Sequence, residues 1–295
     1  MKPDQSTRRA RRSALYVPAT NEKALAKLGS LACDVVIIDL EDAVGPDEKQ
    51  TARDNLKRFF AAPSWGKREM VIRVNAMTSE WGADDLALAA TLQPDAILLP
   101  KVDTPRDILE ANDRLDEADV PAATTLWAMI ETPRAILNLG SIAELGRDRS
   151  SRLSCFVAGT NDLVKETGIS DVPDRRYLVP FLLQMVMAAR AGGIDVVDGV
   201  FNDFRNLDGF SRQCEEAAAM GFDGKTLIHP GQIEAANSAF SPAPEAVADA
   251  RAIVTAFALP ENAGKGVIQI SGRMVERLHL AQAERLLSKA AAAPS

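Results

Sequence analysis

Acidic side chains recur at the ends of short apolar runs in this sequence. Asp39, Glu41 and Asp42 close one run, Glu131 follows another, and Asp162 lies just beyond a third. Carboxylates that converge on one place repel each other unless cations separate them. Carboxylate oxygens without histidine or thiolate favour a hard ion such as Mg²⁺. The pattern therefore predicts a divalent-metal site, if the fold brings the ends of these runs together.

The position of each carboxylate predicts a different role. We expect Glu131 and Asp162 to bind the metal directly, because Mg²⁺ takes one or two carboxylates from a protein and keeps several waters. We expect Glu41 and Asp42, with Asp39 beside them, to hold the waters around the metal. Other roles stay open: Asp162 could cap a helix that begins near residue 163, and Glu131 could precede a helix.

Arg73 and Lys101 supply cations close to these carboxylates. Arg73 lies near the end of one run and Lys101 follows the next. The forked donors of Arg73 suit a substrate carboxylate, although the side chain could also form a salt bridge with Asp39 or Glu41. Lys101 could form a Schiff base with a carbonyl substrate, but the carboxylates favour a metal-dependent route.

Other catalytic patterns are poorly supported. His229 and His279 are the two histidines, which is too few for a histidine metal site and gives poor support to a Ser-His-Asp triad. His229 precedes a proline, and we expect it to stabilise a turn. The segment GFDGKT at 221–226 is similar to a phosphate-binding loop, but it lacks the first glycine and leads into a strand, so we exclude that function.

Eight apolar runs would position these side chains. They are rich in Val, Ile and Leu and mostly lack alternation, which is typical of strands buried on both faces of a parallel sheet. The runs cover residues 14–17, 34–40, 70–74, 96–99, 126–130, 155–158, 194–197 and 225–228. Helical patterns lie between them at 21–32, 49–61, 84–92, 104–118 and 180–191. The alternation predicts an α/β fold, the TIM (β/α)₈ barrel, in which the C-terminal ends of the strands share one rim. An open doubly wound sheet would need a G-x-G-x-x-G turn, which the sequence lacks.

The patterns divide the chain into three parts. Residues 1–12 contain four arginines, at positions 8, 9, 11 and 12, and are expected to form a flexible basic tail, although this cluster could meet a phosphate-bearing ligand. Residues 13–232 are expected to form the TIM-barrel catalytic domain. Residues 233–295 are expected to form a C-terminal helical extension that packs on the barrel or on a neighbouring subunit.

The composition excludes several classes of protein. A net charge of −7 and a pI near 5.1 argue against a nucleic-acid partner. The three widely spaced cysteines are expected to be reduced thiols in the core. No apolar stretch approaches ~18 residues, and none has the length of a signal-peptide core, so we expect no membrane partner and a cytoplasmic location.

The segments around these residues resemble the citrate lyase beta subunit and the related CoA-ester lyases of the HpcH/HpaI aldolase superfamily. The matching segments are RRSALYVPATNEKALAK, DVVIIDLEDAV, VIRVNAMTSEWGADDL, AILLPKVDT, MIETPRAI, GTNDLV, GFDGKTLIHPGQI and GRMV. They occur in the family order over almost the whole chain, and as a set they are highly specific. The resemblance implies a Mg²⁺-dependent TIM barrel that assembles as a homotrimer or hexamer.

The resemblance also implies roles for individual residues. Glu131 and Asp162 match the metal ligands, and Arg73 matches the arginine that grips the oxo-acid product. Tyr16 and Lys27 fall where CoA-binding members place an aromatic residue and a lysine.

Two positions depart from the family pattern. Asn21 replaces an arginine found in some CoA-binding members. The C-terminal motif, usually G-K-M-(I/V)-D, here reads GRMVE over residues 272–276. In the family its aspartate reaches a neighbouring subunit's active site as acid or base, so Glu276 is the expected counterpart. The extra methylene moves the carboxyl outward by about 1.5 Å, a displacement that can cost about 10²-fold in rate.

Together these roles imply the reversible cleavage of a malyl-, citramalyl- or citryl-CoA type thioester to acetyl-CoA, or a homologue, and a 2-oxo acid. Arg73, Glu131 and Glu276 would be catalytic, and the first two would also contact the substrate. Three alternatives stay open: a malyl-CoA-type thioesterase, a CoA-independent 2-oxo acid aldolase, and a citrate lyase beta subunit that needs acyl-carrier partner subunits. The expected partners are therefore small molecules, a CoA thioester and a 2-oxo acid.

Overall fold

Eight parallel strands, β1 to β8, pair in chain order and close into a barrel. The computed structural model describes residues 9–62, 65–270 and 272–292. The strands are β1 (Ser13–Pro18), β2 (Val35–Asp39), β3 (Glu69–Arg73), β4 (Ala96–Leu99), β5 (Thr125–Ile130), β6 (Leu153–Ala158), β7 (Asp195–Asp198) and β8 (Gly224–Leu227). Each predicted run coincides with one strand, with its ends at most two residues away. The predicted TIM (β/α)₈ barrel is confirmed.

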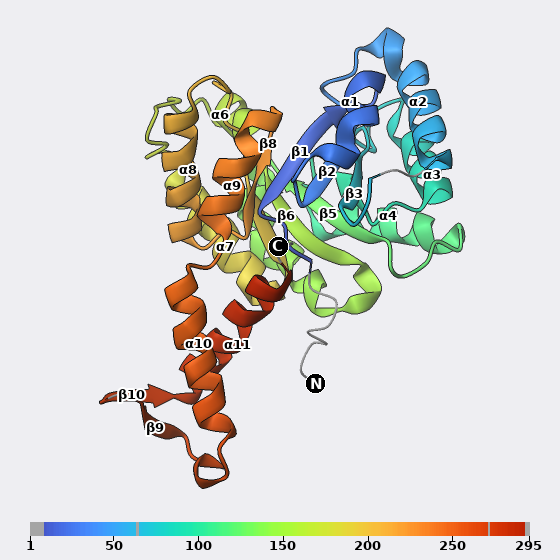
Figure 1. The fold of residues 1–295 in the computed structure, drawn as a ribbon. Helices are drawn as coiled ribbons and strands as arrows, with labels where there is room; N and C mark the ends of the chain where they lie inside the picture. The colour runs from blue at the N-terminus through green and yellow to red at the C-terminus, as the bar shows by residue number, and fades with distance from the viewer. Residues whose placement is uncertain (1–8, 63–64, 271, 293–295) are drawn as a thin grey trace. The chain divides into compact units, whose positions relative to one another are not determined.

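Helices surround the strands (Figure 1). They are α1 (Glu22–Lys27), α2 (Lys49–Ala61), α3 (Gly82–Leu92), α4 (Pro105–Glu117), α5 (Pro133–Glu144), α6 (Thr160–Thr167), α7 (Val179–Gly192), α8 (Leu207–Met220) and α9 (Ile233–Phe240). The helix predicted at 21–32 is shorter, because it continues as a 3₁₀ turn over Leu28–Ser30. Helices α5, α6 and α8 lie outside the predicted helical ranges, although α5 and α6 match the helices considered after Glu131 and near residue 163.

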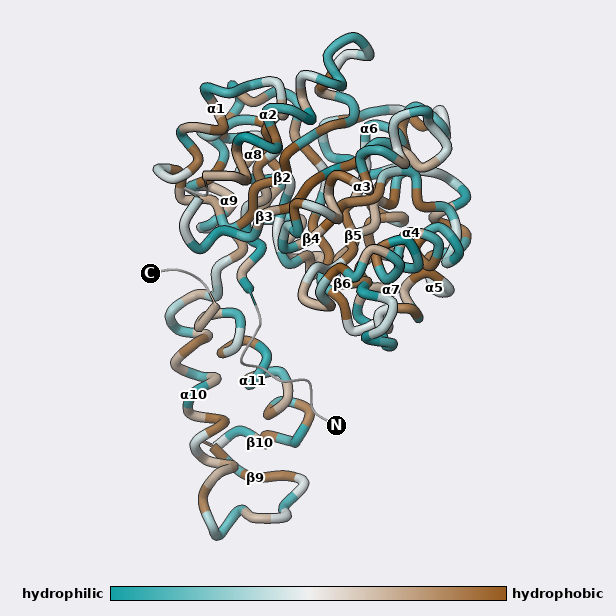
Figure 2. Tube along the Cα trace, turned by 90° about the vertical axis from the view of Figure 1, so that its right-hand side faces the viewer, coloured by the Kyte–Doolittle hydropathy of each residue, from teal (hydrophilic) through white to brown (hydrophobic). Residues whose placement is uncertain are grey.

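The strands are buried on both of their faces. One set of side chains fills the barrel interior, including Val35, Ile37 and Trp127. The alternate set, including Val36 and Ile38, packs against the helices. Figure 2 accordingly shows β2, β3, β5 and β6 as mainly hydrophobic. Double burial explains why the sequence shows continuous apolar runs instead of alternation.

Strand register sets the composition of the C-terminal rim. Asp39, the last residue of β2, pairs with Arg73, the last residue of β3. Ile130 of β5 pairs with Ala158 of β6, so Glu131 and Gly159 follow at the same level. Residues 28 or 34 positions apart in the sequence are therefore neighbours on one edge of the barrel.

Two of the four N-terminal arginines correct the prediction of a flexible basic tail. Position 8 lies outside the described residues. The Arg11 side chain is 10% exposed, and its guanidinium lies 2.7 Å from Glu69 and 3.2 Å from Asp195 and stacks on Trp127 with its Cζ 4.6 Å from the ring centroid. Arg12 lies 2.8 Å from Asp34. Ion pairs at the N-terminal end of the strands hold these two side chains, so they are part of the barrel.

The chain divides into two compact units after Phe240, not at residue 233. Helix α9 belongs to the barrel unit because Ile233 and Ala236 are buried in its core. In addition, the side chain of Asn237 is bonded to Ser13 Oγ at 2.7 Å and donates to the Ala32 carbonyl at 2.8 Å.

The second unit contains α10 (Pro244–Ala258), the antiparallel strands β9 (Val267–Ile270) and β10 (Arg273–Glu276), and α11 (Arg277–Ala292). Its small core includes Phe257, Ile268 and Val275. All three cysteines of the chain are free and buried, as predicted. In the described part of the chain, no helix is long and apolar enough to cross a membrane.

Candidate active site

Arg73 and Asp39 form a bidentate ion pair on the rim. Arg73 Nε donates to Asp39 Oδ1 at 2.7 Å and Nη2 donates to Oδ2 at 2.6 Å. Both side chains are buried, and the bidentate geometry fixes the plane of the guanidinium. The ring of Tyr16 lies against its face, with the centroid 4.9 Å from Arg73 Cζ. The salt bridge allowed for Arg73 therefore exists, and it orients this cation at the rim.

The loop after β2 turns around Asp39. Its carboxylate accepts the N–H groups of Glu41 at 2.9 Å and Ala43 at 3.1 Å. Arg73 Nη1 lies 2.9 Å from Glu41 Oε2, an ion pair without hydrogen-bond alignment, and 3.4 Å from Asp42. Burial raises the pKa of Glu41 to about 8, although Arg73 opposes this rise. Because the loop turns here, two further carboxylates face the guanidinium.

Glu131 and Asp162 form a second acidic pair around Lys101. Glu131 is 1% exposed and accepts the Lys101 backbone N–H at 2.7 Å. The Lys101 ammonium lies 2.9 Å from Asp162 and 3.8 Å from Glu131. Burial raises the pKa of Glu131, and the nearby Lys101 limits the rise. Lys101 has a left-handed backbone with φ of +53°, an uncommon conformation that recurs at functional sites.

Gly159 makes room for this pair. A Cβ at this position would lie 2.3 Å from Glu131 Cβ and 2.7 Å from Glu131 Oε2. A side chain here would therefore displace the carboxylate. Sequence reasoning missed this residue, although its place just after β6 in the segment GTND is a usable signal.

A pocket of about 280 Å³ opens between these groups. Its lining includes Arg73, Asp39, Asp42, Asp162 and Tyr16. A larger hollow of about 390 Å³ lies between α3 and α4, but its walls are mainly alanine and leucine. We assign the chemistry to the smaller pocket, because it combines charged groups with the C-terminal rim of the barrel.

The donor set fits a magnesium ion. In residues 9–62, 65–270 and 272–292, no group of three or more His, Cys, Asp or Glu side chains could hold a metal. Glu131 and Asp162 supply two carboxylates, and Mg²⁺ characteristically takes one or two and fills its remaining positions with water. One ammonium, that of Lys101, reaches both carboxylates. A single Mg²⁺ ion near the position of the Lys101 ammonium would therefore lie within reach of both carboxylates.

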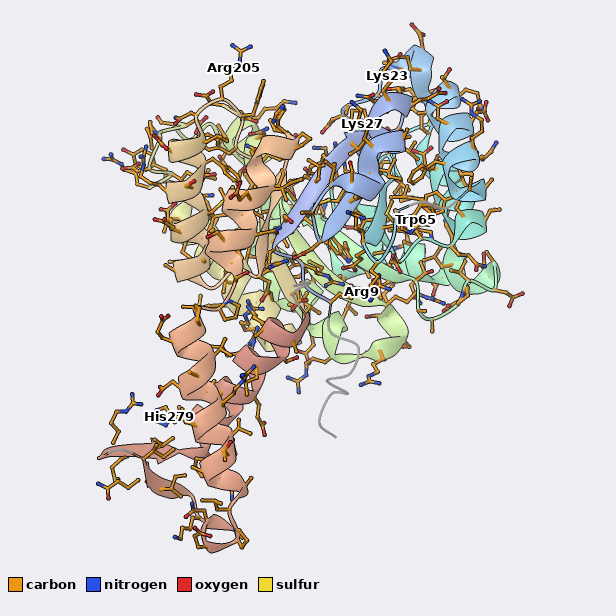
Figure 3. The ribbon with its side chains drawn as sticks, viewed as in Figure 1. Arg9, Lys23, Lys27, Trp65, Arg205 and His279 are labelled. Atoms are coloured by element: carbon orange, nitrogen blue, oxygen red, sulfur yellow. The ribbon has the colours of Figure 1, made fainter. Side chains whose placement is uncertain are left out.

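The remaining predicted residues lie in different places. Tyr16 is inside the barrel beside Arg73, and among the described residues its hydroxyl has no hydrogen-bond partner. Lys27 is exposed on α1 (Figure 3). Glu276 is exposed in the second unit, where its N–H donates to His279 Nδ1 at 2.9 Å. His229 stabilises a turn as predicted, since its Nδ1 accepts the Gly231 N–H at 3.0 Å.

Comparisons with known proteins identify the family and the fold. Residues 12–230 match the HpcH/HpaI aldolase/citrate lyase family. The chain is 44% identical over 281 residues to a (3S)-malyl-CoA thioesterase of Cereibacter sphaeroides, covering 95% of each protein. It is 33% identical over 291 residues to citrate lyase subunit beta of Escherichia coli, covering 97% of this chain and 95% of that protein. The fold is similar, with a TM-score of 0.75 and 28% identity, to that of CitE from Mycobacterium tuberculosis in complex with magnesium, acetoacetate and coenzyme A. That match covers 98% of this chain and 100% of the other.

Proposed function

The chain belongs to the HpcH/HpaI aldolase/citrate lyase family, and we propose that it cleaves a carbon–carbon bond in a malyl-type CoA thioester. The substrate would be a 3-hydroxyacyl-CoA that carries a second carboxylate. The observation that supports this proposal best is the fixed guanidinium of Arg73 in the same pocket as the Asp162 carboxylate. A cation that binds carboxylates thus lies beside an acidic pair suited to Mg²⁺.

Arg73 would bind the carboxylate of the substrate. Its Nε and Nη2 are held by Asp39, so Nη1 is the donor available to a ligand. Asp42 is the weaker partner of Nη1, at 3.4 Å and with a side chain that is 68% exposed. We therefore expect the substrate carboxylate to displace Asp42 while the Asp39 clamp keeps the guanidinium in place.

Glu131 and Asp162 would hold Mg²⁺, which when bound supplies Lewis-acid stabilisation to the hydroxyl oxygen as it becomes a carbonyl. The hydroxyl would lose its proton to the Glu276 carboxylate of another subunit, the bond between carbons 2 and 3 of the acyl chain would break, and its electrons would pass to the thioester enolate. A proton then converts the enolate into acetyl-CoA or a homologue. The proposed donor is Glu276 of another subunit in a trimer or hexamer.

Hydrolysis of the thioester is the second candidate reaction. The relative at 44% identity is named a (3S)-malyl-CoA thioesterase, whereas the citrate lyase subunit is 33% identical. The same pocket would then bind the malyl group by its carboxylate through Arg73, and water would attack the thioester carbonyl. The products would be the free dicarboxylic acid and CoA.

Product analysis separates these reactions. The purified chain would be incubated with malyl-, methylmalyl-, citramalyl- and citryl-CoA, with Mg²⁺ or with EDTA, and the products identified by mass spectrometry. Acetyl-CoA or propionyl-CoA with a 2-oxo acid supports cleavage, and free CoA with the intact hydroxy acid supports hydrolysis. Turnover of a 2-oxo acid aldol without any thioester would instead indicate a CoA-independent aldolase. Inactivity that ends when acyl-carrier subunits are added would indicate a citrate lyase beta subunit.

A further inference from the structure

Lys49 is a buried cation directly behind the acidic loop. It is the first residue of α2 and is 6% exposed. Its ammonium donates to the carbonyls of Leu40 at 2.7 Å and Glu41 at 2.8 Å, and to Asn75 Oδ1 at 2.8 Å. It also lies 4.9 Å from the centroid of the Trp81 ring. The three N–H donors of the ammonium are therefore all used, and all three acceptors are neutral.

Local stability does not explain a lysine at this position. Burial of an ammonium carries a desolvation cost of several kcal/mol, even after relaxation. A positive charge in the first turn of a helix is also disfavoured by the helix dipole. In the described part of the chain, no carboxylate lies within ion-pair distance of Lys49. Burial and helix formation would both favour a different residue here, since burial lowers the pKa of Lys49 and the more distant carboxylates, Asp85 first, only partly oppose this.

The acceptors of Lys49 show what it holds. Two of them are consecutive carbonyls of the loop that carries the predicted acidic residues Glu41 and Asp42. Asn75 braces the same loop, because its Nδ2 donates to the Leu40 carbonyl at 2.8 Å and to Asp85 at 2.6 Å. The loop therefore has a fixed peptide orientation on its inner side and presents its carboxylates on the other side.

We propose that Lys49 is a positioning residue that holds the loop after β2 so that Glu41 and Asp42 face Arg73. With the loop in place, Arg73 Nη1 is flanked by these carboxylates at 2.9 and 3.4 Å. Without it, Asp42 and Ala43 of the pocket wall would lose their fixed place beside Arg73, and the space that the substrate carboxylate enters when it displaces Asp42 would no longer be preformed. This inference rests on the proposed role of Arg73 in carboxylate binding.

Lys49→Met tests the inference, because methionine keeps an unbranched side chain and removes the charge and its donors. The matched control is Lys57→Met on the same helix, where the lysine side chain is 55% exposed. Pyruvate and CoA binding would be measured separately by calorimetry in the presence of Mg²⁺. We expect the Kd for pyruvate to rise about 10- to 100-fold in Lys49→Met, the usual effect of losing a partner that orients a site. The Kd for CoA should stay unchanged, and Lys57→Met should match the parent protein in both.

The split between the two ligands separates positioning from general destabilisation. Equal affinity for pyruvate in Lys49→Met and Lys57→Met would overturn the inference, as would a parallel loss of pyruvate and CoA binding. If Lys49→Met does not fold, Lys49→Gln is judged by the same criteria, and failure of both to fold would assign Lys49 to stability alone. Chemical rescue adds a further criterion: added propylammonium should restore pyruvate binding to Lys49→Ala. The proposed function fails separately, if the parent protein turns over no CoA thioester yet binds pyruvate.

Discussion

The Glu131 carboxylate at the end of β5 is buried without a close ion pair. Its nearest donor is a backbone N–H at 2.7 Å, and the Lys101 ammonium remains 3.8 Å away. Burial of a carboxylate without full charge compensation destabilises the folded protein. The raised pKa of Glu131 has the same cause, because burial disfavours the charged form. At the scale of single residues, this unfavourable burial is the strongest sign that Glu131 serves a ligand.

Glu131→Gln should remove metal-dependent turnover and leave the fold intact. The amide keeps the shape of the side chain but removes the charge that binds Mg²⁺, so we expect activity to fall by about 10²–10³-fold. The Tm should be equal or higher, because a neutral amide costs less to bury. Electron paramagnetic resonance titration with Mn²⁺ should show weaker binding. Glu110→Gln, on the exposed face of α4, is the control, and full activity in Glu131→Gln would refute the assignment.

Lys101→Met should strengthen metal binding in the absence of substrate. The ammonium contacts Asp162 at 2.9 Å and therefore competes with a metal for the same carboxylate. The lysine side chain is 38% exposed, and an ion pair screened by solvent contributes at most ~1 kcal/mol. We accordingly expect up to about a fivefold lower Kd for Mn²⁺, measured by the same resonance titration. An unchanged or higher Kd would show that Lys101 does not compete for the site.

Residue type and position predicted the two acidic groups and Arg73, but not the residues that support them. Lys49 lies ten positions after the end of β2, and its contacts depend on which way two carbonyls point. Gly159 matters only because Glu131 comes within 2.3 Å of a Cβ position there. Neither property is expressed in side-chain periodicity. The segment GTND marks Gly159 only as a glycine just after a strand, and no comparable signal marks Lys49.

At the scale of elements, the barrel was predictable because burial on both faces gives each strand a continuous run of apolar residues. The segment GFDGKT is an instructive case, since β8 (Gly224–Leu227) runs through it as expected for a strand and not for a phosphate loop. Its Lys225 is fully buried and bonded to Asp198 of β7 at 2.6 Å. Arg175, before α7, lies 2.8 Å from the same carboxylate. This contact between elements could not be predicted, because it depends on register between strands and a distant loop.

Asp198→Asn should destabilise the barrel by about 3 kcal/mol, because it leaves two buried cations without their shared anion. Burial alone would raise the pKa of Asp198, but Lys225 and Arg175 hold it below its ordinary value. A lowered native pKa stabilises the fold above the ordinary aspartate pKa of ~3.9, and this stabilisation is lost as the pH falls through the native value. The difference between variant and parent should therefore be constant from about pH 5 to 8 and shrink only at lower pH.

Urea unfolding over this pH range measures the effect of Asp198→Asn. Asp208→Asn, an exposed aspartate at the start of α8, is the matched control and should change little. Equal free energies of unfolding for the two variants would show that the buried cluster contributes nothing to stability.

At the scale of the whole molecule, the proposed acid lies in a different unit from the other proposed site residues. Glu276 ends β10 in the second unit, and Arg73, Glu131 and Asp162 belong to the barrel. Near Glu276, Met274 and Leu278 are 72% and 52% exposed. The family resemblance implies that this segment serves a neighbouring subunit. If the site is shared between chains, two variants that are each inactive should complement one another, which is not possible if each site lies within one chain.

Mixing two inactive variants should restore activity if Glu276 acts on a neighbouring chain. Glu131→Gln lacks the metal ligand and Glu276→Gln lacks the acid, so each homo-oligomer should be nearly inactive. In a mixed oligomer, the barrel of a Glu276→Gln chain keeps Glu131 and can receive Glu276 from a Glu131→Gln neighbour. Random exchange in a closed ring would make about a quarter of the sites complete, and activity should approach that share of the parent value. Subunits would be exchanged in mild denaturant, and each variant exchanged with itself provides the control. If Glu276 served its own chain, no mixture could contain a complete site. Native mass spectrometry would show whether the oligomers are mixed. Activity that stays at the level of the separate variants in mixed oligomers would show that Glu276 acts within its own chain or takes no part in the reaction.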